Sequence, residues 1–418
     1  MGCRLAGHWS RMADLAWRFL RQGYDAVAAD RAARRGSDDF ESRLLGRRAV
    51  VVRSREGARC FYDEDLVRRQ GAVPPPLAWL LFGRGAVHGL DAPEHRRRKA
   101  MFLDALAAPR LVPLTEAVEA ALREQIASWP GRDVMVFDEL VRAYGRGVLD
   151  WAGLRLEAGE ADARSRQLAQ IVDGFGGAGS AYARAWRARV DANRWAGQVV
   201  QDARAGRVPA PEGSLLEEIA GSSLSRHTAG VELLNVLRPT VAVAWLGTFA
   251  ALRFAQLEDL EGWRARLVDP GGGRDRFSFA QEVRRTTPFA PALAAKARRR
   301  ADVAGIVVHP GDRLVLDIIG INHDPARWSD PETFHPDRFL DVEPGAFDLV
   351  PQGGGSPVTG HRCPGESVAL SLLEVTLRIL PLLELEVVGA EVDRHRIPTL
   401  PGKGLAVKVP ASVSRTGS

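Results

Sequence analysis

The sequence predicts a mainly α-helical fold with a small β-rich region. Apolar residues recur with helical spacing along most of the 418-residue chain, whereas runs of strand type are short and few. Hydrophobic residues make up 45% of the chain, which is enough for one large buried core. We find no internal repeat and no long linker, so we expect residues 1–418 to form a single domain.

The clearest helical patterns span residues 111–129, 230–255 and 279–286. The second pattern is long and almost wholly apolar, which predicts a buried central helix. Ser278 stands before the third pattern, and Gln281 follows three residues later, so this spacing predicts a capping box at the start of that helix.

The predicted strands are few, and they occupy residues 48–53, 303–308 and 314–319. The proline run at 74–76 and the glycine-rich stretch 270–273 are typical of loops. The strands should therefore form a β region much smaller than the helical part.

The overall charge and the cysteine count limit the class of protein. The net charge of +5 is too small to choose among an acidic substrate, an acidic partner and nucleic acid, but we find no nucleic-acid-binding motif. No segment approaches the roughly 18–20 apolar residues of a membrane helix, so we expect no membrane span. The three cysteines, Cys3, Cys60 and Cys363, are too few for a disulfide framework and favour a cytoplasmic protein.

The stretch PQGGGSPVTGHRCPGE at residues 351–366 places Cys363 between a glycine-rich loop and an apolar helical pattern. A thiolate at a helix N-terminus is favoured by the helix dipole and by nearby cations. Pro364 suits the first helical turn, and the glycines allow the backbone to approach a flat ligand. Cys363 is therefore a candidate axial ligand of haem iron, with a buried structural cysteine as the alternative.

Glu282 and Arg285 are three residues apart and share one helix face, a pattern that alone most often marks a solvated ion pair. Downstream follow His335-Pro336-Asp337-Arg338-Phe339 and then the cysteine loop. This order of motifs resembles the cytochrome P-450 superfamily. The resemblance implies a haem b cofactor held by Cys363, and a structural network of Glu282, Arg285 and Arg338 behind it.

The resemblance is closer still to the bacterial fatty-acid peroxygenases, and it covers nearly the whole chain. It includes AVHGLDAPEHRRRKAMFL from Ala86 and ELLNVLRPTVAVA from Glu232. Ser356 and Thr359 stand where the wider superfamily typically has Phe and Gly. The resemblance implies the cytochrome P-450 fold, with haem between the central long helix and the cysteine loop. It also implies hydrogen peroxide as co-substrate and no required redox partner.

Arg238-Pro239 stands where ordinary members of the superfamily carry an acid–alcohol pair. Proline kinks a helix, and a buried arginine needs an anionic partner, which a carboxylate provides in bidentate fashion. We therefore expect a carboxylic acid, such as a long-chain fatty acid, to dock on Arg238 and act as acid and base during hydroxylation at Cα or Cβ. The alternative is a structural ion pair of Arg238 with Glu232 or with another helix.

The resemblance also implies roles for residues around the pocket. Thr286 and Thr287 stand where relatives often have bulkier aromatic residues, so the substrate need not be a straight-chain fatty acid. The residues that resemble substrate-channel positions, for which plain core packing is the alternative, are Phe82, Phe175, Phe289 and Ala290. The residues that resemble haem-propionate partners are Arg69, His95, Lys99 and His361.

His88 resembles a residue of the distal pocket, and a histidine there can exchange a proton near neutral pH. This role would favour oxidative decarboxylation of the fatty acid to a terminal alkene. The alternative is a structural histidine whose hydrogen bonds are made within the protein and which has no catalytic role. The nearby run Arg96-Arg97-Arg98 is expected to be a solvated face.

The sequence is compatible with two further functions. One is a conventional monooxygenase supplied by a separate ferredoxin and reductase, although Arg238-Pro239 replaces the proton relay that such an enzyme uses. The other is a haem- or lipid-binding sensor without turnover, in which Arg238 only anchors a ligand.

Overall fold

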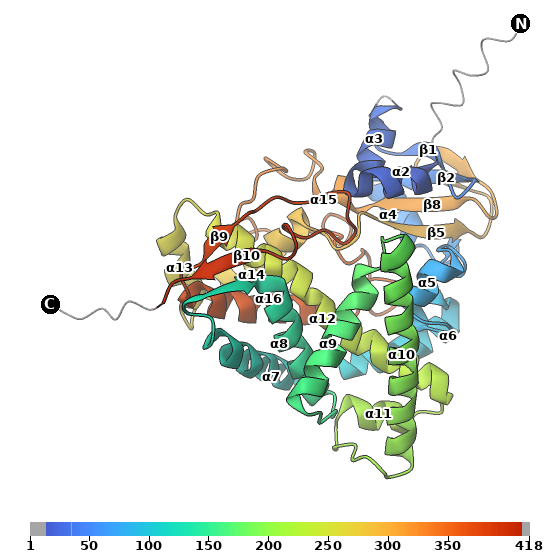
Figure 1. The fold of residues 1–418 in the computed structure, drawn as a ribbon. Coiled ribbons are helices and arrows are strands. Elements are labelled where there is room, and N and C mark those ends of the chain that lie inside the picture. Colours follow the sequence, from blue (N-terminus) through green and yellow to red (C-terminus); the bar gives the residue numbers. More distant parts are fainter. Residues whose placement is uncertain (1–13, 35, 412–418) are drawn as a thin grey trace, which may run out of the picture.

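Helices form most of the protein, as the sequence predicts, and the computed structural model describes residues 14–34 and 36–411 (Figure 1). The α-helices are α2 (Leu15–Gln22), α3 (Ala26–Ala32), α4 (Arg55–Tyr62), α5 (Pro75–Leu81), α6 (Ala92–Ala105), α7 (Ala108–Ile126), α8 (Val136–Trp151), α9 (Ala158–Asp173), α10 (Gly179–Arg204), α11 (Leu215–Gly221), α12 (Arg226–Ala255), α13 (Leu260–Val268), α14 (Gly273–Thr286), α15 (Ile318–Asn322) and α16 (Glu366–Ile379). Short 3-10 turns are η2 (Gly23–Asp25), η3 (Val87–Gly89) and η4 (Leu380–Leu382).

The strands form one larger sheet and two small ones. The strands are β1 (Phe40–Leu44), β2 (Arg47–Val52), β3 (Val67–Arg68), β4 (Arg132–Met135), β5 (Ala292–Ala297), β6 (Ala301–Val303), β7 (Ile306–Val308), β8 (Arg313–Asp317), β9 (Glu386–Val388) and β10 (Ala406–Val409). The five-stranded sheet has the order β1-β2-β8-β5-β3, in which β2 and β8 are parallel with Val50 opposite Leu314. This sheet and α2–α3 lie together at one end of the molecule (Figure 1). The other sheets are β4-β10-β9 and the pair β6-β7.

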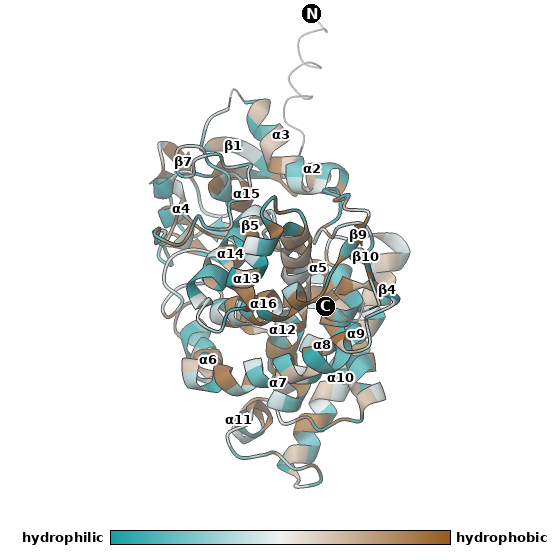
Figure 2. Cartoon of the chain, turned by 90° about the vertical axis from the view of Figure 1, so that its left-hand side faces the viewer, coloured by the Kyte–Doolittle hydropathy of each residue, from teal (hydrophilic) through white to brown (hydrophobic). Residues whose placement is uncertain are grey.

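The central helix predicted at residues 230–255 is α12, which begins four residues earlier, where the Ser225 side chain accepts a hydrogen bond from the Thr228 N–H. It packs against α8, α9, α10 and α16. By length and composition α12 could cross a membrane, contrary to our expectation, but 94% of its most apolar stretch is buried inside the protein. An outer helix such as α10 instead mixes hydrophilic and hydrophobic residues along its length (Figure 2).

Three local predictions were wrong. Ser278 does not cap a helix, because α14 already begins at Gly273, and the Ser278 hydroxyl accepts a hydrogen bond from the Phe339 N–H at 2.9 Å. Residues 303–308 are not one strand, because Ala304 and Gly305 have positive φ angles and turn the chain from β6 into β7. The prolines at 74–76 do not form a loop, since Pro74 is the N-cap of α5 and the other two begin the helix, where a missing N–H is tolerated.

The predicted network around Glu282 is confirmed, and it is buried rather than solvated. Glu282 and Arg285 are fully buried side chains joined by two hydrogen bonds of 2.7 Å. Arg338 donates from Nε to both Glu282 carboxylate oxygens at 3.1 Å, and the His335 N–H donates to one of them at 3.0 Å. The carboxylate therefore ties α14 to the segment that carries the HPDRF motif.

We expect Glu282→Ala to reduce the free energy of unfolding by about 3–5 kcal/mol, because it leaves buried guanidinium groups without their anion. Chemical denaturation of the haem-loaded protein measures this change. Glu261→Ala is the matched control, since Glu261 is 80% exposed in an i,i+3 pair with Arg264 and should contribute less than about 1 kcal/mol. Equal effects of the two substitutions would contradict a structural role for the buried network.

Candidate active site

The cysteine loop holds Cys363 directly before α16. The Cys363 N–H donates to the Gln352 carbonyl at 3.0 Å, which anchors the loop to itself. Gly353 has a φ of 98°, and a Cβ there would lie 2.9 Å from the Tyr62 hydroxyl oxygen, so glycine is required at this position. The helix begins at Glu366 with Gly365 as its N-cap, so Pro364 precedes the cap and does not belong to the first turn as predicted.

The Cys363 thiol is surrounded by positive groups, but burial has the larger effect and raises its pKa. The Gly365 N–H, Lys99 and Arg284 act in the opposite direction. Lys99 also donates to the Arg362 carbonyl at 2.7 Å and to the Gly360 carbonyl. The helix end and the cations therefore act on the thiol in the predicted direction but do not outweigh burial, and a metal ion bound to the sulfur would supply further positive charge.

The four predicted propionate partners lie together beside this loop. The rings of His95 and His361 stack with centroids 3.9 Å apart, and His95 Nδ1 has no hydrogen-bond partner. Burial, followed by Lys99 for His95 and by Arg69 for His361, lowers the histidine pKa values to about 4 and about 2. Burial also lowers the pKa of Lys99 to about 8 and that of Arg69 to about 10. Such a group of N–H donors fits an anionic ligand.

The residues present fit haem on both sides. Pro239 on α12 is exposed, although every other residue from Ala229 to Leu252 is buried, so α12 borders an open space at this point. Cys363 offers a sulfur ligand, and the donors around His95 fit two propionates. When bound, a haem with a cysteine thiolate ligand supplies an iron centre that favours O–O cleavage.

Arg238 is only 3% exposed, and no carboxylate within residues 14–34 and 36–411 forms an ion pair with it. Its Nη2 donates to the Asn235 side-chain oxygen at 3.2 Å, and Nη1 has no hydrogen-bond partner. Asn235 in turn donates to Glu232 at 2.9 Å. Burial, followed by the charge of Arg189, lowers the Arg238 pKa, and Glu232 opposes this shift. Arg238 thus retains N–H groups that can bind an acidic ligand.

The carboxylate of Glu232 is occupied by other partners, so the predicted alternative of a direct ion pair with Arg238 is wrong. Arg98 donates to Glu232 at 2.8 Å, and the Val87 N–H donates to the same oxygen at 3.0 Å. Arg98 is consequently not part of a solvated face, contrary to our expectation for the arginine run. The spacing of Glu232, Asn235 and Arg238 at i,i+3 was the signal in the sequence for this connected set.

Phe82, His88 and Arg238 are brought together, as the resemblance implies. The rings of Phe82 and His88 stack with centroids 4.1 Å apart, and the Arg238 guanidinium carbon lies 5.7 Å from the Phe82 centroid. Burial, and then the charge of Arg238, lowers the His88 pKa to about 3. His88 is therefore neutral at physiological pH, and the expectation that it titrates near neutrality was wrong.

The other predicted channel residues lie farther along the core. The Phe289 ring is 6.0 Å from the ring of Trp245, which is two turns beyond Arg238 on α12, and the Phe289 carbonyl accepts a hydrogen bond from the Tyr24 hydroxyl at 2.8 Å. Ala290 is half-buried next to Phe289, and Phe175 is half-buried after α9. Their contact with substrate stays a prediction.

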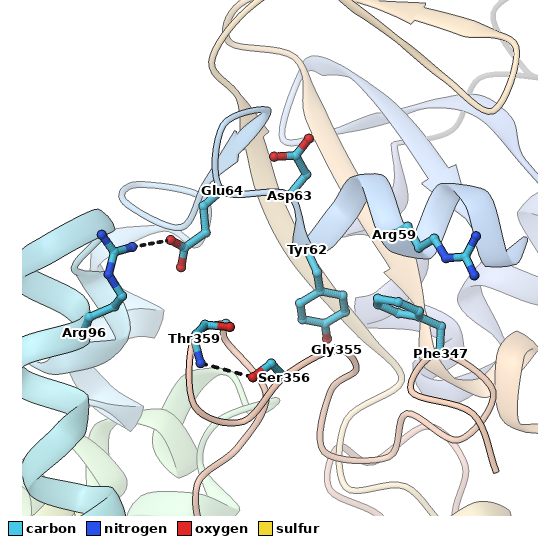
Figure 3. A pocket seen from close by; sticks show the side chains of 10 residues that line it. Arg59, Tyr62, Asp63, Glu64, Arg96, Phe347, Gly355, Ser356 and Thr359 are labelled. Atoms are coloured by element: carbon cyan, nitrogen blue, oxygen red, sulfur yellow. Dashed lines mark hydrogen bonds and ion pairs between the residues drawn. The ribbon is translucent and has the colours of Figure 1, made fainter.

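A cavity of about 400 Å³ lies on the outer side of the cysteine loop (Figure 3). Tyr62, Glu64 and Arg96 border it, and Arg96 donates to Glu64 at 2.8 Å. Ser356 and Thr359 lie on its other side, where the Ser356 hydroxyl accepts a hydrogen bond from the Thr359 N–H at 3.2 Å. None of the predicted substrate residues borders this cavity.

A lone cysteine before a helix, a buried Glu-x-x-Arg network and a long central helix define a haem-thiolate protein. The cytochrome P-450 family model matches residues 278–408. The structure is similar to cytochrome P450SP alpha (CYP152B1) in complex with (R)-ibuprofen, with 35% identity over 95% of this chain and 98% of that one, and a TM-score of 0.88. The chain belongs to the cytochrome P-450 family, in the fatty-acid peroxygenase branch that its sequence resembles.

Two other relatives agree with this assignment. Ligand-free cytochrome P-450 OleT is 29% identical over 96% of this chain and 98% of its own, with a TM-score of 0.89. Cytochrome P-450 138 of Mycobacterium tuberculosis (strain ATCC 25618 / H37Rv) is 25% identical over 390 residues, which are 87% of this chain and 85% of that protein. The likeness therefore extends over nearly the whole length of these proteins.

We expect acid to destabilise the protein through His88. Below about pH 6.5 the unfolded chain binds a proton at this imidazole, whereas folded His88, with its pKa of about 3, does not. Between pH 7 and pH 5 this difference should reduce the free energy of unfolding by about 2 kcal/mol, and His88→Gln should remove that loss.

Denaturant titrations of the haem-loaded protein at several pH values measure this effect. His309→Gln, which changes an exposed histidine, is the control and should keep the acid sensitivity of the wild type. If His88→Gln were as sensitive to acid as the wild type, the neutral, buried state of His88 would be contradicted.

Proposed function

We propose that this protein uses hydrogen peroxide to hydroxylate a carboxylic acid, such as a fatty acid, at Cα or Cβ. The observation that carries the proposal is the buried Arg238 guanidinium with a free Nη1. The relatives support it, because cytochrome P450SP alpha was solved with (R)-ibuprofen and a variant of OleT with arachidonic acid, and both ligands are carboxylic acids.

Binding of the acid follows from the charge of the pocket. A substrate carboxylate on Arg238 would supply the anion that the buried cation lacks, and the guanidinium fork would fix its orientation. Because the head group is fixed, the carbon atoms next to it are the ones held at a constant position. The alkyl part would then extend along apolar side chains such as Phe82 and Phe289.

Proton transfer is assigned to the substrate itself. Glu232, the carboxylate nearest to Arg238 along α12, already accepts hydrogen bonds from Arg98, Asn235 and the Val87 N–H. A carboxylate oxygen of the substrate, held at Arg238, is free to accept a proton from hydrogen peroxide and to return it when the O–O bond breaks. The substrate carboxylate would thus do the work of the acid–alcohol pair, which is absent here because Arg238-Pro239 occupies its positions.

Decarboxylation to a terminal alkene is the second candidate outcome. The observation that favours it is the position of His88, which stacks on Phe82 beside Arg238 and is neutral at pH 7. A neutral imidazole has an unprotonated ring nitrogen that can accept a hydrogen bond near the substrate head group. Both outcomes use the same docking of the acid on Arg238.

Incubation of the purified, haem-loaded protein with hydrogen peroxide and a panel of carboxylic acids tests the proposal, with products identified by mass spectrometry. Hydroxy acids or alkenes formed with peroxide alone would support a peroxygenase. Turnover only with a reductant and a ferredoxin would show a conventional monooxygenase, and acid binding without any product would show a sensor. The cytoplasmic location and the single-domain organisation stay predictions.

We expect Arg238→Met to lower kcat/KM for carboxylic acids by about 100-fold or more, because the acid loses a buried, charge-assisted partner. Steady-state kinetics with peroxide measure this. Arg253→Met is the matched control, since it removes an arginine near the far end of α12 and should change kcat/KM less than about threefold. An Arg238→Met enzyme with wild-type kinetics would refute docking of the carboxylate on this residue.

A further inference from the structure

A second buried arginine lies near Arg238 and has no partner in the described residues. Arg189 on α10 is 2% exposed, and its Nε, Nη1 and Nη2 atoms make no hydrogen bond. A guanidinium carries five N–H donors, and leaving them unpaired in the protein interior is costly. Burial lowers the Arg189 pKa to about 10, so the group remains a cation at neutral pH.

The position of the Arg189 guanidinium is set by a glycine. Gly83 directly follows Phe82 and has a φ of 91°, and a Cβ at Gly83 would lie 2.0 Å from Arg189 Nη2 and 2.8 Å from Val231 Cγ1. The absence of a side chain at Gly83 therefore admits the guanidinium between the end of α5 and α12. The same glycine follows the residue whose ring faces Arg238.

Arg189 lies beside the same helix that carries Arg238. Val231, beside Arg189, precedes Arg238 by seven residues, which is two helical turns and roughly 10 Å along the helix axis. A step of seven residues returns to nearly the same helix face. The charge of Arg189 also lowers the pKa of Arg238 more than any other neighbouring charge does.

The charges of the buried arginines, of half-buried Arg98 and of Glu232 do not balance. Arg98, Arg189 and Arg238 carry three positive charges, Glu232 carries one negative charge, and neutral His88 adds none, which leaves a net charge of +2. Glu232 is fully occupied by Arg98, Asn235 and the Val87 N–H. A single carboxylate on Arg238 would still leave one uncompensated charge, with the donors of Arg189 unpaired.

We propose that the pocket binds carboxylic acids that carry a second acidic group, with one carboxylate on Arg238 and the other on Arg189. The substrate class is then the dicarboxylic acids, with several methylene groups separating the two acids because Val231, which lies beside Arg189, is two helical turns from Arg238. This inference rests on the proposed function only for the placement of the first carboxylate at Arg238.

A series of linear dicarboxylic acids and their monomethyl esters tests this assignment, because each ester keeps the length of its parent acid and removes one charge. Dissociation constants are measured with the haem-loaded protein by calorimetry and by the change in haem absorbance. At the best length, the wild type should bind the diacid about tenfold or more tightly than the ester. Arg189→Met should reduce this ratio to within about twofold by weakening the diacid more than the ester.

Further variants separate charge from structure. Arg187→Met changes an exposed arginine on the same helix and should keep the wild-type ratio. Arg189→Lys keeps a positive charge and should retain most of the preference, whereas Gly83→Ala displaces the guanidinium and should lower it. The haem absorbance spectrum confirms that each variant is folded and loaded.

Three results would overturn the assignment. One is a wild type that binds diacid and ester equally, and another is an Arg187→Met variant that loses the preference as fully as Arg189→Met. The third is an Arg189→Met variant that weakens both ligands alike, because this would mean that both arginines hold one carboxylate. Peroxide-dependent oxidation of simple monocarboxylic acids is measured in a separate assay. This assay tests the proposed function, whereas the binding series tests only the second carboxylate site.

Discussion

The site depends on a buried positive charge that the protein itself does not neutralise. Arg238 lies on the most buried helix of the fold, and the carboxylate closest along that helix, Glu232, is held by Arg98 and by the Val87 N–H. Asn235 connects Glu232 to Arg238 but carries no charge. An unpaired buried ion is costly, so a ligand of opposite charge should stabilise this folded state strongly when it binds. The chemistry of the ligand is thus determined by what the folded chain leaves unpaired.

Another buried arginine in the structure has acceptors for all of its hydrogen-bond donors, and it can be compared with the two arginines of the site. Arg285 is as deeply buried as Arg238, yet it has the Glu282 carboxylate and three backbone carbonyls as acceptors. That network joins α14 to the segment that follows α15 and leaves no donor for a ligand. Among the described residues Arg189 has no acceptor, and Arg238 has only the Asn235 side-chain oxygen. We therefore regard the first group as part of the scaffold and the second as part of a binding site.

Local sequence patterns predicted the scaffold, because each one depends on residues close together in the chain. The apolar pattern of α12 is of this kind and was confirmed, whereas the Glu282–Arg285 spacing alone predicted a solvated pair and only the order of motifs along the chain implied the buried network. The errors have a different origin. The Ser278 cap was wrong because a distant segment uses its hydroxyl group, and the role of Arg98 was missed because its partner is 134 residues away. Arg189 gave no signal at all, since its burial depends on Gly83 and α12, which only the tertiary structure brings to it.

The arginines of the site should stay positively charged, and an acidic ligand negatively charged, over a wide pH range. Carboxylic acids are ionised above about pH 4–5, and arginines remain cationic at neutral pH even where burial lowers the pKa of Arg189 to about 10. His88 would reduce selectivity if it became charged, but its pKa of about 3 keeps it neutral over the same range. The neighbouring cation that lowers the His88 pKa is Arg238 itself, which acts after burial. The arginine that attracts the acid thus also keeps the adjacent imidazole uncharged, so that the head group meets one neutral base and fixed positive charges.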